Sequence, residues 1–146
     1  MPRVRVDLVI DADIDDVWKM VCGVEDYPRY MDNVRSIAVL DRTDRTRTIA
    51  WSVLLKGSIL EWSEFEQIDD DSRRIDFHQL DGDLAQFEGY WQLSADDSGK
   101  TRVELDISFE IGIPLLAPML DPVAVRALRD NSEQMLRSLE RKALAR

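Results

Sequence analysis

The only histidine of the chain, His78, is the first residue whose chemistry suggests a reaction. An imidazole titrates near neutral pH, so it could act as a general base that removes a proton lying between two carbonyl groups. A two-residue turn at positions 81–82 would place His78 on the same face of the sheet as Phe87. A longer turn would bring Phe77 to that face instead, because a shift of one residue reverses the side of every side chain. Both registers stay open from the sequence.

Glutamates on the expected strands form the second group that could do acid–base chemistry. Four of them stand among aromatic residues: Glu61, Glu64, Glu66 and Glu88. A glutamate that faces the interior would have a pKa raised towards neutral pH by burial, and it could then donate a proton. The alternative is that each one points to the solvated outer face of the sheet. We select Glu64 and His78 as the candidate catalytic residues.

Metal and nucleophile chemistry have little support in the sequence. One histidine and one cysteine cannot complete a closed zinc site without carboxylates, and neither an H-E-x-x-H nor a C-x-x-C motif occurs. No G-x-S-x-G nucleophile motif occurs either. We expect Cys22 to pack as a buried structural thiol, and we expect no metal and no cofactor.

The charge balance narrows the class of partner. The 146 residues carry a formal net charge of −10, and the basic residues are scattered. Nucleic acids bind through Lys and Arg that displace counterions, so neither a nucleic acid nor an anionic membrane is an expected partner. No apolar run is long enough to span a bilayer, and the N-terminal residues lack the apolar core of a signal peptide. A cytoplasmic location is the expectation, and a lone cysteine is compatible with it.

Hydrophobic patterning predicts the elements that hold these residues. Alternating apolar residues predict a strand over Arg3–Ile10. A short helix that begins after Asp13 and ends at Gly23 is expected next, followed by a second short helical turn over 25–31. Further strands are predicted over 34–40, 47–55, 58–68, 73–80, 85–93 and 101–111.

The last expected element is a long helix. Asp121 followed by Pro122 is typical of a helix start, and apolar residues then repeat at helical spacing into the basic C-terminal residues. The apolar, proline-containing segment over 113–120 is interpreted as a loop that is either buried or a mobile lid, and we favour the lid.

These elements predict an α+β architecture with an internal hollow. Short links make consecutive strands antiparallel, and only the long helix is large enough to cover one face of the sheet. A bent sheet that wraps a single helix is not filled completely by the two surfaces. The remaining gap would be an apolar cavity, which is where small molecules bind.

A set of segments, in this order and spacing, points to one superfamily. They are positions 9–12 leading into 17–18, then 24–31, 61–65, 74–80, 87–91 and 131–136. Together they resemble the START/Bet v 1-like helix-grip superfamily (SRPBCC), which includes START lipid carriers, the birch-pollen-allergen fold, coenzyme Q-binding proteins and polyketide aromatase/cyclases. The likeness covers nearly the whole chain.

This resemblance implies a single domain over 1–146, in which a seven-stranded curved antiparallel sheet wraps round a long C-terminal helix. Two short helices lie between the first and second strands. The cavity would be entered near these short helices and the loop before the long helix. In the cyclases, polar residues of the pocket orient a poly-β-keto chain for aldol closure and dehydration.

The resemblance also assigns individual positions. His78 falls where a cyclase has a pocket-facing basic residue, Trp91 where it has a pocket tryptophan, and Asn131 near its helix asparagine. Other positions depart from the cyclase pattern. Val34 stands in place of a tyrosine, and Gln67 or Glu66 stands in place of an arginine.

We therefore expect a protein that binds a hydrophobic small molecule, and we favour a polyketide cyclase or aromatase that needs no cofactor. The alternative is a non-catalytic lipid or quinone carrier; a relative of translation-targeting toxins conflicts with the acidic charge. Expected partners are a polyketide intermediate, a lipid or a quinone, with an acyl carrier protein for the cyclase, and the chain would be a monomer or a homodimer. The expected ligand-binding residues are Tyr27, Met31, Trp51, Trp62, Phe65, Phe77, Phe87, Tyr90, Trp91, Leu116, Met119, Asn131 and Met135.

Overall fold

Antiparallel pairing joins the strands of the chain into one curved sheet. The computed structural model describes residues 1–145. The strands are β1 (Arg3–Ile10), β2 (Val34–Arg42), β3 (Thr46–Leu55), β4 (Ser58–Asp69), β5 (Arg74–Gly82), β6 (Gln86–Ala95) and β7 (Thr101–Glu110). Their order across the sheet is β1-β7-β6-β5-β4-β3-β2. Strands β2 to β7 therefore follow one another as hairpins, as their short links require, and β1 pairs with β7.

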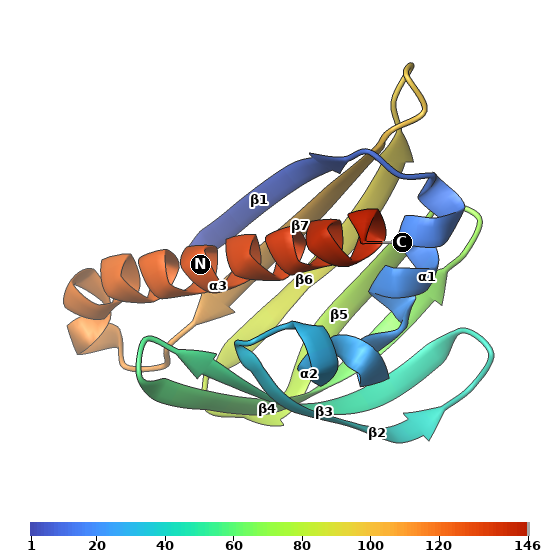
Figure 1. Ribbon diagram of the computed structural model, residues 1–146. Helices are drawn as coiled ribbons and strands as arrows, with labels where there is room; N and C mark the ends of the chain where they lie inside the picture. The colour runs from blue at the N-terminus through green and yellow to red at the C-terminus, as the bar shows by residue number, and fades with distance from the viewer. Residues whose placement is uncertain (146) are drawn as a thin grey trace.

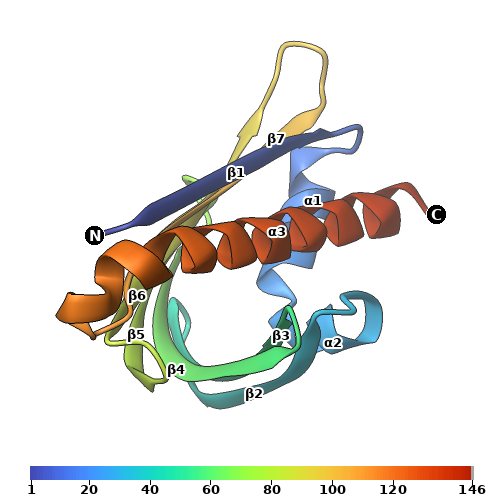
Figure 2. The same cartoon turned by 90° about the vertical axis from the view of Figure 1, so that its left-hand side faces the viewer.

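Helices cover one face of this sheet. α1 (Ile14–Cys22), η1 (Val24–Asp26) and α2 (Tyr27–Tyr30) lie between β1 and β2, and η2 (Pro114–Leu116) leads into α3 (Ala117–Leu144). Figure 1 shows α3 crossing the concave face, with α1 beside its C-terminal half. Figure 2, turned by 90°, shows the sheet curling round the helix. The arrangement confirms the predicted helix-grip fold.

The β3–β4 hairpin shows how local sequence sets the sheet. Leu55 pairs with Ser58, so only two residues form the turn. These residues, Lys56 and Gly57, have φ angles of 43° and 85°. Two successive positive φ angles are typical of the hairpin turn whose twist matches that of the strands. The predicted break at this position is confirmed.

The β5–β6 hairpin decides which side chains face α3. Pairing places Phe77 opposite Gly89 and His78 opposite Glu88, and β5 continues to Gly82. The turn is therefore longer than two residues, and the Gln79 side chain spans it by donating to the Leu84 carbonyl at 2.8 Å. Phe77 is buried on the concave face, whereas His78 is exposed. The register that would bring His78 inward is wrong.

The long helix begins one turn earlier than predicted. α3 starts at Ala117 rather than after Asp121. Pro118 lies in the first turn, where no N–H is needed, and Pro122 is accommodated inside the helix at the loss of one hydrogen bond. The apolar segment before Asp121 is thus largely helical. It is not a buried loop either, because Leu115 is 93% exposed.

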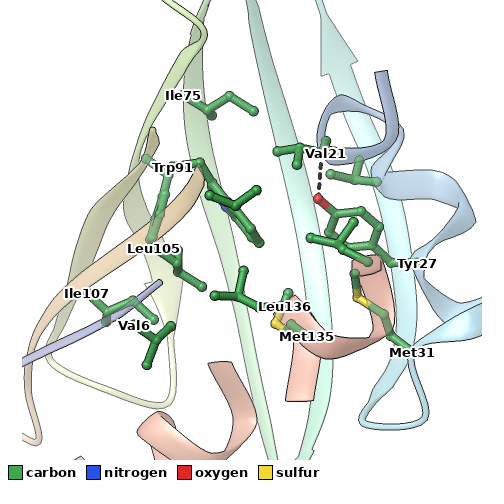
Figure 3. Packing of buried hydrophobic residues seen from close by; sticks show 14 of the residues in the cluster. Val6, Val21, Tyr27, Met31, Ile75, Trp91, Leu105, Ile107, Met135 and Leu136 are labelled. Carbon is green, nitrogen blue, oxygen red and sulfur yellow. Dashed lines mark hydrogen bonds between the residues drawn. The ribbon is translucent and has the colours of Figure 1, made fainter. Parts of the chain in front are cut away.

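Apolar side chains from the sheet and the helices meet beneath α3. Figure 3 shows this core, with the hydroxyl of Tyr27 donating to the carbonyl of Val21 at 2.5 Å. Leu139, on the C-terminal half of α3, is fully buried in the same cluster. The labelled members are Val6, Val21, Tyr27, Met31, Ile75, Trp91, Leu105, Ile107, Met135 and Leu136. This packing fixes the helix over the sheet.

Candidate ligand-binding cavity

A small cavity lies between the concave face of the sheet and α3. Its lining residues are Trp51, Val53, Leu60, Trp62, Glu64, Phe77, Phe87, Trp91, Leu105, Ile107, Leu128, Asn131, Ser132 and Met135. The cavity volume is about 30 Å³, enough for about two water molecules, since each needs roughly 10–15 Å³. The interior is therefore filled more completely than the curved-sheet argument predicts, because large side chains from β3 to β7 converge under the helix.

Aromatic rings form one continuous wall of the cavity. Trp51 and Trp62 are cross-strand partners, and their rings stack with centroids 5.4 Å apart and planes 5° from parallel. Phe87 packs against Trp62 at 4.9 Å, and Phe77 packs against Phe87 at 5.9 Å. Trp91 completes this side of the core (Figure 3). Flat aromatic surfaces of this kind suit a ligand that is itself planar.

A carboxyl group interrupts the apolar wall. Glu64 follows Trp62 by two residues on β4, so strand alternation turns both side chains to the concave face. The Glu64 side chain is buried, and its carboxyl oxygen accepts a hydrogen bond from Trp62 Nε1 at 2.7 Å. It is the only titratable side chain among the described residues that line the cavity.

Behind Glu64 lies a buried ion pair. Glu66 is the next concave-facing residue of β4, and Arg47 is its cross-strand partner on β3. The Arg47 Nε atom donates to the Glu66 carboxylate at 2.6 Å, and Nη1 donates to the Cys22 carbonyl at 2.6 Å. Both charged side chains are at least nine-tenths buried. We call the three side chains of Glu64, Glu66 and Arg47 the acid array.

The acid array holds two carboxyl groups but one cation. Burial is the main cause that raises the pKa of Glu64 well above its ordinary range, and a hydrogen bond to Glu66 and the charge of Glu66 act in the same direction. Arg47 opposes the rise more weakly. Of the two carboxyl groups, Glu64 is therefore the one whose pKa burial raises and which keeps its proton to higher pH, because an uncompensated charge in this apolar site would be costly.

Several buried polar atoms have no hydrogen-bond partner within residues 1–145. Two belong to side chains that line the cavity, Trp51 Nε1 and Ser132 Oγ. A buried donor without a partner costs free energy that a water molecule or a ligand oxygen would recover. These atoms therefore mark places where a bound molecule would gain hydrogen bonds.

Polar contacts connect α3 to the far half of the sheet. The helix packs mainly on β1 and α1. Across the cavity, Asn33 Nδ2 donates to the backbone and side-chain oxygens of Asn131, the backbone contact being 3.2 Å. Nearer the β3–β4 turn, Lys56 Nζ lies 3.0 Å from the Asp130 carboxylate. These links close the cavity on the side of β2 to β4.

Comparison with models of protein families finds a match over most of the chain. Residues 10–136 match the family described as polyketide cyclase / dehydrase and lipid transport. The chain belongs to this family. A search of curated protein sequences finds no match.

Solved structures share the fold over nearly the full chain. A protein from Thermus thermophilus is 28% identical, with a TM-score of 0.91 and coverage of 99% of this chain and 98% of that one. The Zhui aromatase/cyclase from Streptomyces sp. R1128 is 20% identical, with a TM-score of 0.82 and coverage of 97% and 92%. A START superfamily protein from Mycobacterium smegmatis is 17% identical, with a TM-score of 0.80 and coverage of 98% and 97%.

Other features of this polyketide cyclase / dehydrase family member concern membranes and metals. Within the part of the chain that the structure describes, no helix combines the length and apolar character needed to cross a bilayer. Residues 1–145 likewise hold no group of three or more His, Cys, Asp or Glu side chains arranged for a metal ion.

The cavity brings together about half of the residues that the sequence selected. Those that line it are Trp51, Trp62, Phe77, Phe87, Trp91, Asn131 and Met135, together with Glu64. Tyr27 and Met31 are buried beside it without lining it, and the ring of Tyr27 contacts that of Trp51 at 5.8 Å. They support the wall from α2 and the segment that follows.

Three selected residues lie on the convex face instead. His78 is exposed and its ring packs against Phe65, with centroids 5.6 Å apart. Tyr90 lies under the guanidinium of Arg74, and its hydroxyl donates to Glu104 at 2.8 Å. Strand alternation turns these side chains away from α3, so they do not line the cavity. His78 therefore lies on the opposite side of the sheet from the cavity.

The remaining selected residues lie at the start of the long helix or near the acid array. Leu116 and Met119 are exposed on η2 and the first turn of α3, outside the cavity lining. Cys22 is half-buried, and burial raises the pKa of its thiol to about 12, in keeping with a structural role. Glu66, which is ion-paired with Arg47 from β3, is buried next to Glu64 but does not line the cavity.

Lining residues that the sequence analysis missed are mainly aliphatic. They are Val53, Leu60, Leu105, Ile107, Leu128 and Ser132. Their signal was present in the spacing, since Val53 follows Trp51 by two residues on a strand. Leu128 and Ser132 likewise lie within one helical turn of Asn131. They were left out because candidate residues were selected by chemical type and not by the strand or helix face on which they lie.

Proposed function

We propose that this protein binds a hydrophobic small molecule between the sheet and α3 and guides aldol cyclisation and dehydration of a poly-β-keto chain. The observation that carries the proposal is a buried glutamic acid, Glu64, in an otherwise apolar and aromatic wall. The family description, which includes polyketide cyclase and dehydrase, supports it. The similar fold of the Streptomyces aromatase/cyclase adds further support.

Holding the poly-β-keto chain in one orientation would supply much of the rate enhancement of cyclisation. A flexible poly-β-keto chain can close in several ways, and the wall formed by Trp51, Trp62 and Phe87 limits it to folded conformations that lie flat against the rings. Holding the reacting carbons in contact converts a rare encounter of the chain ends into a persistent one, which can remove a large part of a cyclisation barrier. The enol of a β-diketone provides the carbon nucleophile.

Glu64 would act as the proton donor and acceptor. As a neutral acid it gives its proton to the carbonyl oxygen under attack and takes up the proton that the enol oxygen releases. In the dehydration it then gives its proton to the hydroxyl group that leaves as water. The proton lost from the neighbouring carbon returns to the Glu64 carboxylate, so the acid is regenerated. Glu66 and Arg47 do not line the cavity, and they act by holding Glu64 in place.

Ligand entry requires the cavity to widen. A space of about 30 Å³ does not admit a ring. The flexible side chain of Met135 can change rotamer, and the N-terminal half of α3 can move away from β3 and β4 if the Lys56–Asp130 contact opens. The exposed apolar side chains of Leu115 and Met119 would then form the edge of the opening.

A lipid or quinone carrier is the second candidate. It is favoured by the near absence of charge in the cavity lining, where Glu64 is the only titratable side chain described. A carrier needs apolar contact and release but no acid. The family description also includes lipid transport.

The test uses a synthetic phenyl triketone whose aldol closure and loss of water give a phenyl-substituted resorcinol. We expect wild-type protein to quench its tryptophan fluorescence on adding the triketone and to accelerate formation of the resorcinol, followed by liquid chromatography. Leu128→Trp, which fills the cavity from α3, should abolish both effects. Binding without acceleration would favour the carrier, and absence of binding would refute both functions.

A further inference from the structure

We infer that the cavity selects an uncharged ligand that presents a carbonyl oxygen and rejects a carboxylate ligand of the same shape. This inference rests on the proposed function, since it concerns the ligand of the same cavity. The charged groups that a bound molecule can reach decide which kind of ligand is favoured. Fatty acids and ketones of equal size differ in what they need: a carboxylate needs a cation or several donors, whereas a ketone needs one or two neutral donors.

The only cation of the acid array, Arg47, is already paired with protein groups. Arg47 directs Nε to Glu66 and Nη1 to the Cys22 carbonyl, and its side chain is 5% exposed. Its third nitrogen, Nη2, is buried and has no partner within the described chain. Arg47 does not line the cavity, whereas Glu64 does. A ligand carboxylate would therefore meet the carboxyl of Glu64 and no free positive charge.

Neutral donors, in contrast, are available at the lining. Trp51 Nε1 and Ser132 Oγ are buried and unpartnered within residues 1–145, and they come from β3 and α3 respectively. Both can donate to a carbonyl oxygen. A ketone would satisfy a donor that is otherwise unpaired, and it would bring no charge into an apolar site. The acid array thus sets the selectivity by neutralising Arg47, and either of the two donors can hold the ligand oxygen.

The experiment compares two probes that differ in one group. Acetylnaphthalene carries a methyl ketone, and naphthoate carries a carboxylate at the same ring position. Dissociation constants are measured at neutral pH by quenching of tryptophan fluorescence and checked by calorimetry. We expect wild-type protein to bind the ketone at least about tenfold more tightly than the carboxylate, and Trp51→Phe to weaken only the ketone.

Substitutions in the acid array provide the sharper test. In the double variant Glu64→Gln/Glu66→Gln, Arg47 loses its counterion, so the ratio of affinities should shift towards naphthoate by about tenfold or more. Glu61→Gln is the matched control, because Glu61 is an exposed glutamate on the same strand, and it should leave the ratio unchanged. If the double variant does not fold, Trp51→Phe carries the test, because it removes a neutral donor without changing the acid array, and an unchanged ratio of affinities in that variant overturns the inference.

The outcomes separate this inference from the proposed function. Equal binding of both probes by wild-type protein, or an unchanged ratio in folded array variants, overturns the inference while leaving a hydrophobic ligand site intact. If the protein clearly prefers the ketone probe but does not accelerate the triketone reaction, only the catalytic proposal is overturned.

Discussion

Replacing Glu64 by glutamine changes how the stability of the protein depends on pH. Glutamine has nearly the same shape and can still accept the hydrogen bond from Trp62, but it cannot ionise. In the wild type, burial raises the pKa of Glu64 well above its ordinary value of 4.5, with Glu66 adding to the rise. The folded protein therefore keeps this proton at pH values where the unfolded chain has lost it.

The sign of the effect follows from this proton difference. Below the ordinary carboxyl pKa both states hold the proton, and the stability contribution is complete. As the pH rises, the unfolded chain releases the proton first, so the wild type loses about 1.4 kcal/mol of unfolding free energy per pH unit from this group. The loss ends when the pH passes the pKa of Glu64 in the folded state. Glu64→Gln has no such loss.

Urea unfolding followed by tryptophan fluorescence at a series of pH values measures this difference. We expect the stability of Glu64→Gln relative to wild type to rise with pH from the acid range upward, and then to level off. The exposed Glu61→Gln serves as the control and should run parallel to wild type. Parallel curves for Glu64→Gln and wild type would refute a protonated Glu64 in the folded protein.

Three further predictions concern packing and reactivity. Leu139 is fully buried on α3, so Leu139→Ala should lower the free energy of unfolding in urea by about 3 kcal/mol; an unchanged midpoint would contradict the packing of this helix. Gly89→Ala would place its Cβ 1.8 Å from the Asp106 carbonyl oxygen, so circular dichroism should show loss of folded protein, and a native spectrum would contradict the close approach of β6 and β7. Burial raises the pKa of the Cys22 thiol to about 12, so a disulfide reagent at mildly alkaline pH should label it only in urea; rapid labelling of native protein would argue against its burial.

The strands were predictable because their signals are local. Alternation and turn residues fix β3 and β4, and the Lys56-Gly57 pair has the backbone conformation that its two-residue turn requires. The start of α3 was not predictable in the same way. Pro122 is typical of a first helical position, yet the helix tolerates it in its interior because η2 and Pro118 begin the helix earlier.

The sequence did not determine which face of the sheet each strand side chain points to. His78 and Phe77 exchange places with a shift of one residue, and the turn that decides between them is held by the Gln79–Leu84 hydrogen bond, a contact that no pattern encodes. Glu64 was selected by type and strand, but its raised pKa comes mainly from burial, with Glu66 adding to the rise and Arg47 opposing it. The position of Arg47 opposite Glu66 is a property of the β3–β4 register, which the spacing of single residues does not state.

A crystal structure of the protein with acetylnaphthalene bound would show whether the cavity beneath α3 takes up a planar ketone. We predict that the naphthyl ring lies between the Trp51–Trp62 wall and α3, with the ketone oxygen within hydrogen-bond distance of Trp51 Nε1 or Ser132 Oγ and with Met135 displaced. A probe found only on the outer surface, with the interior beneath α3 unchanged, would contradict ligand binding between the sheet and α3.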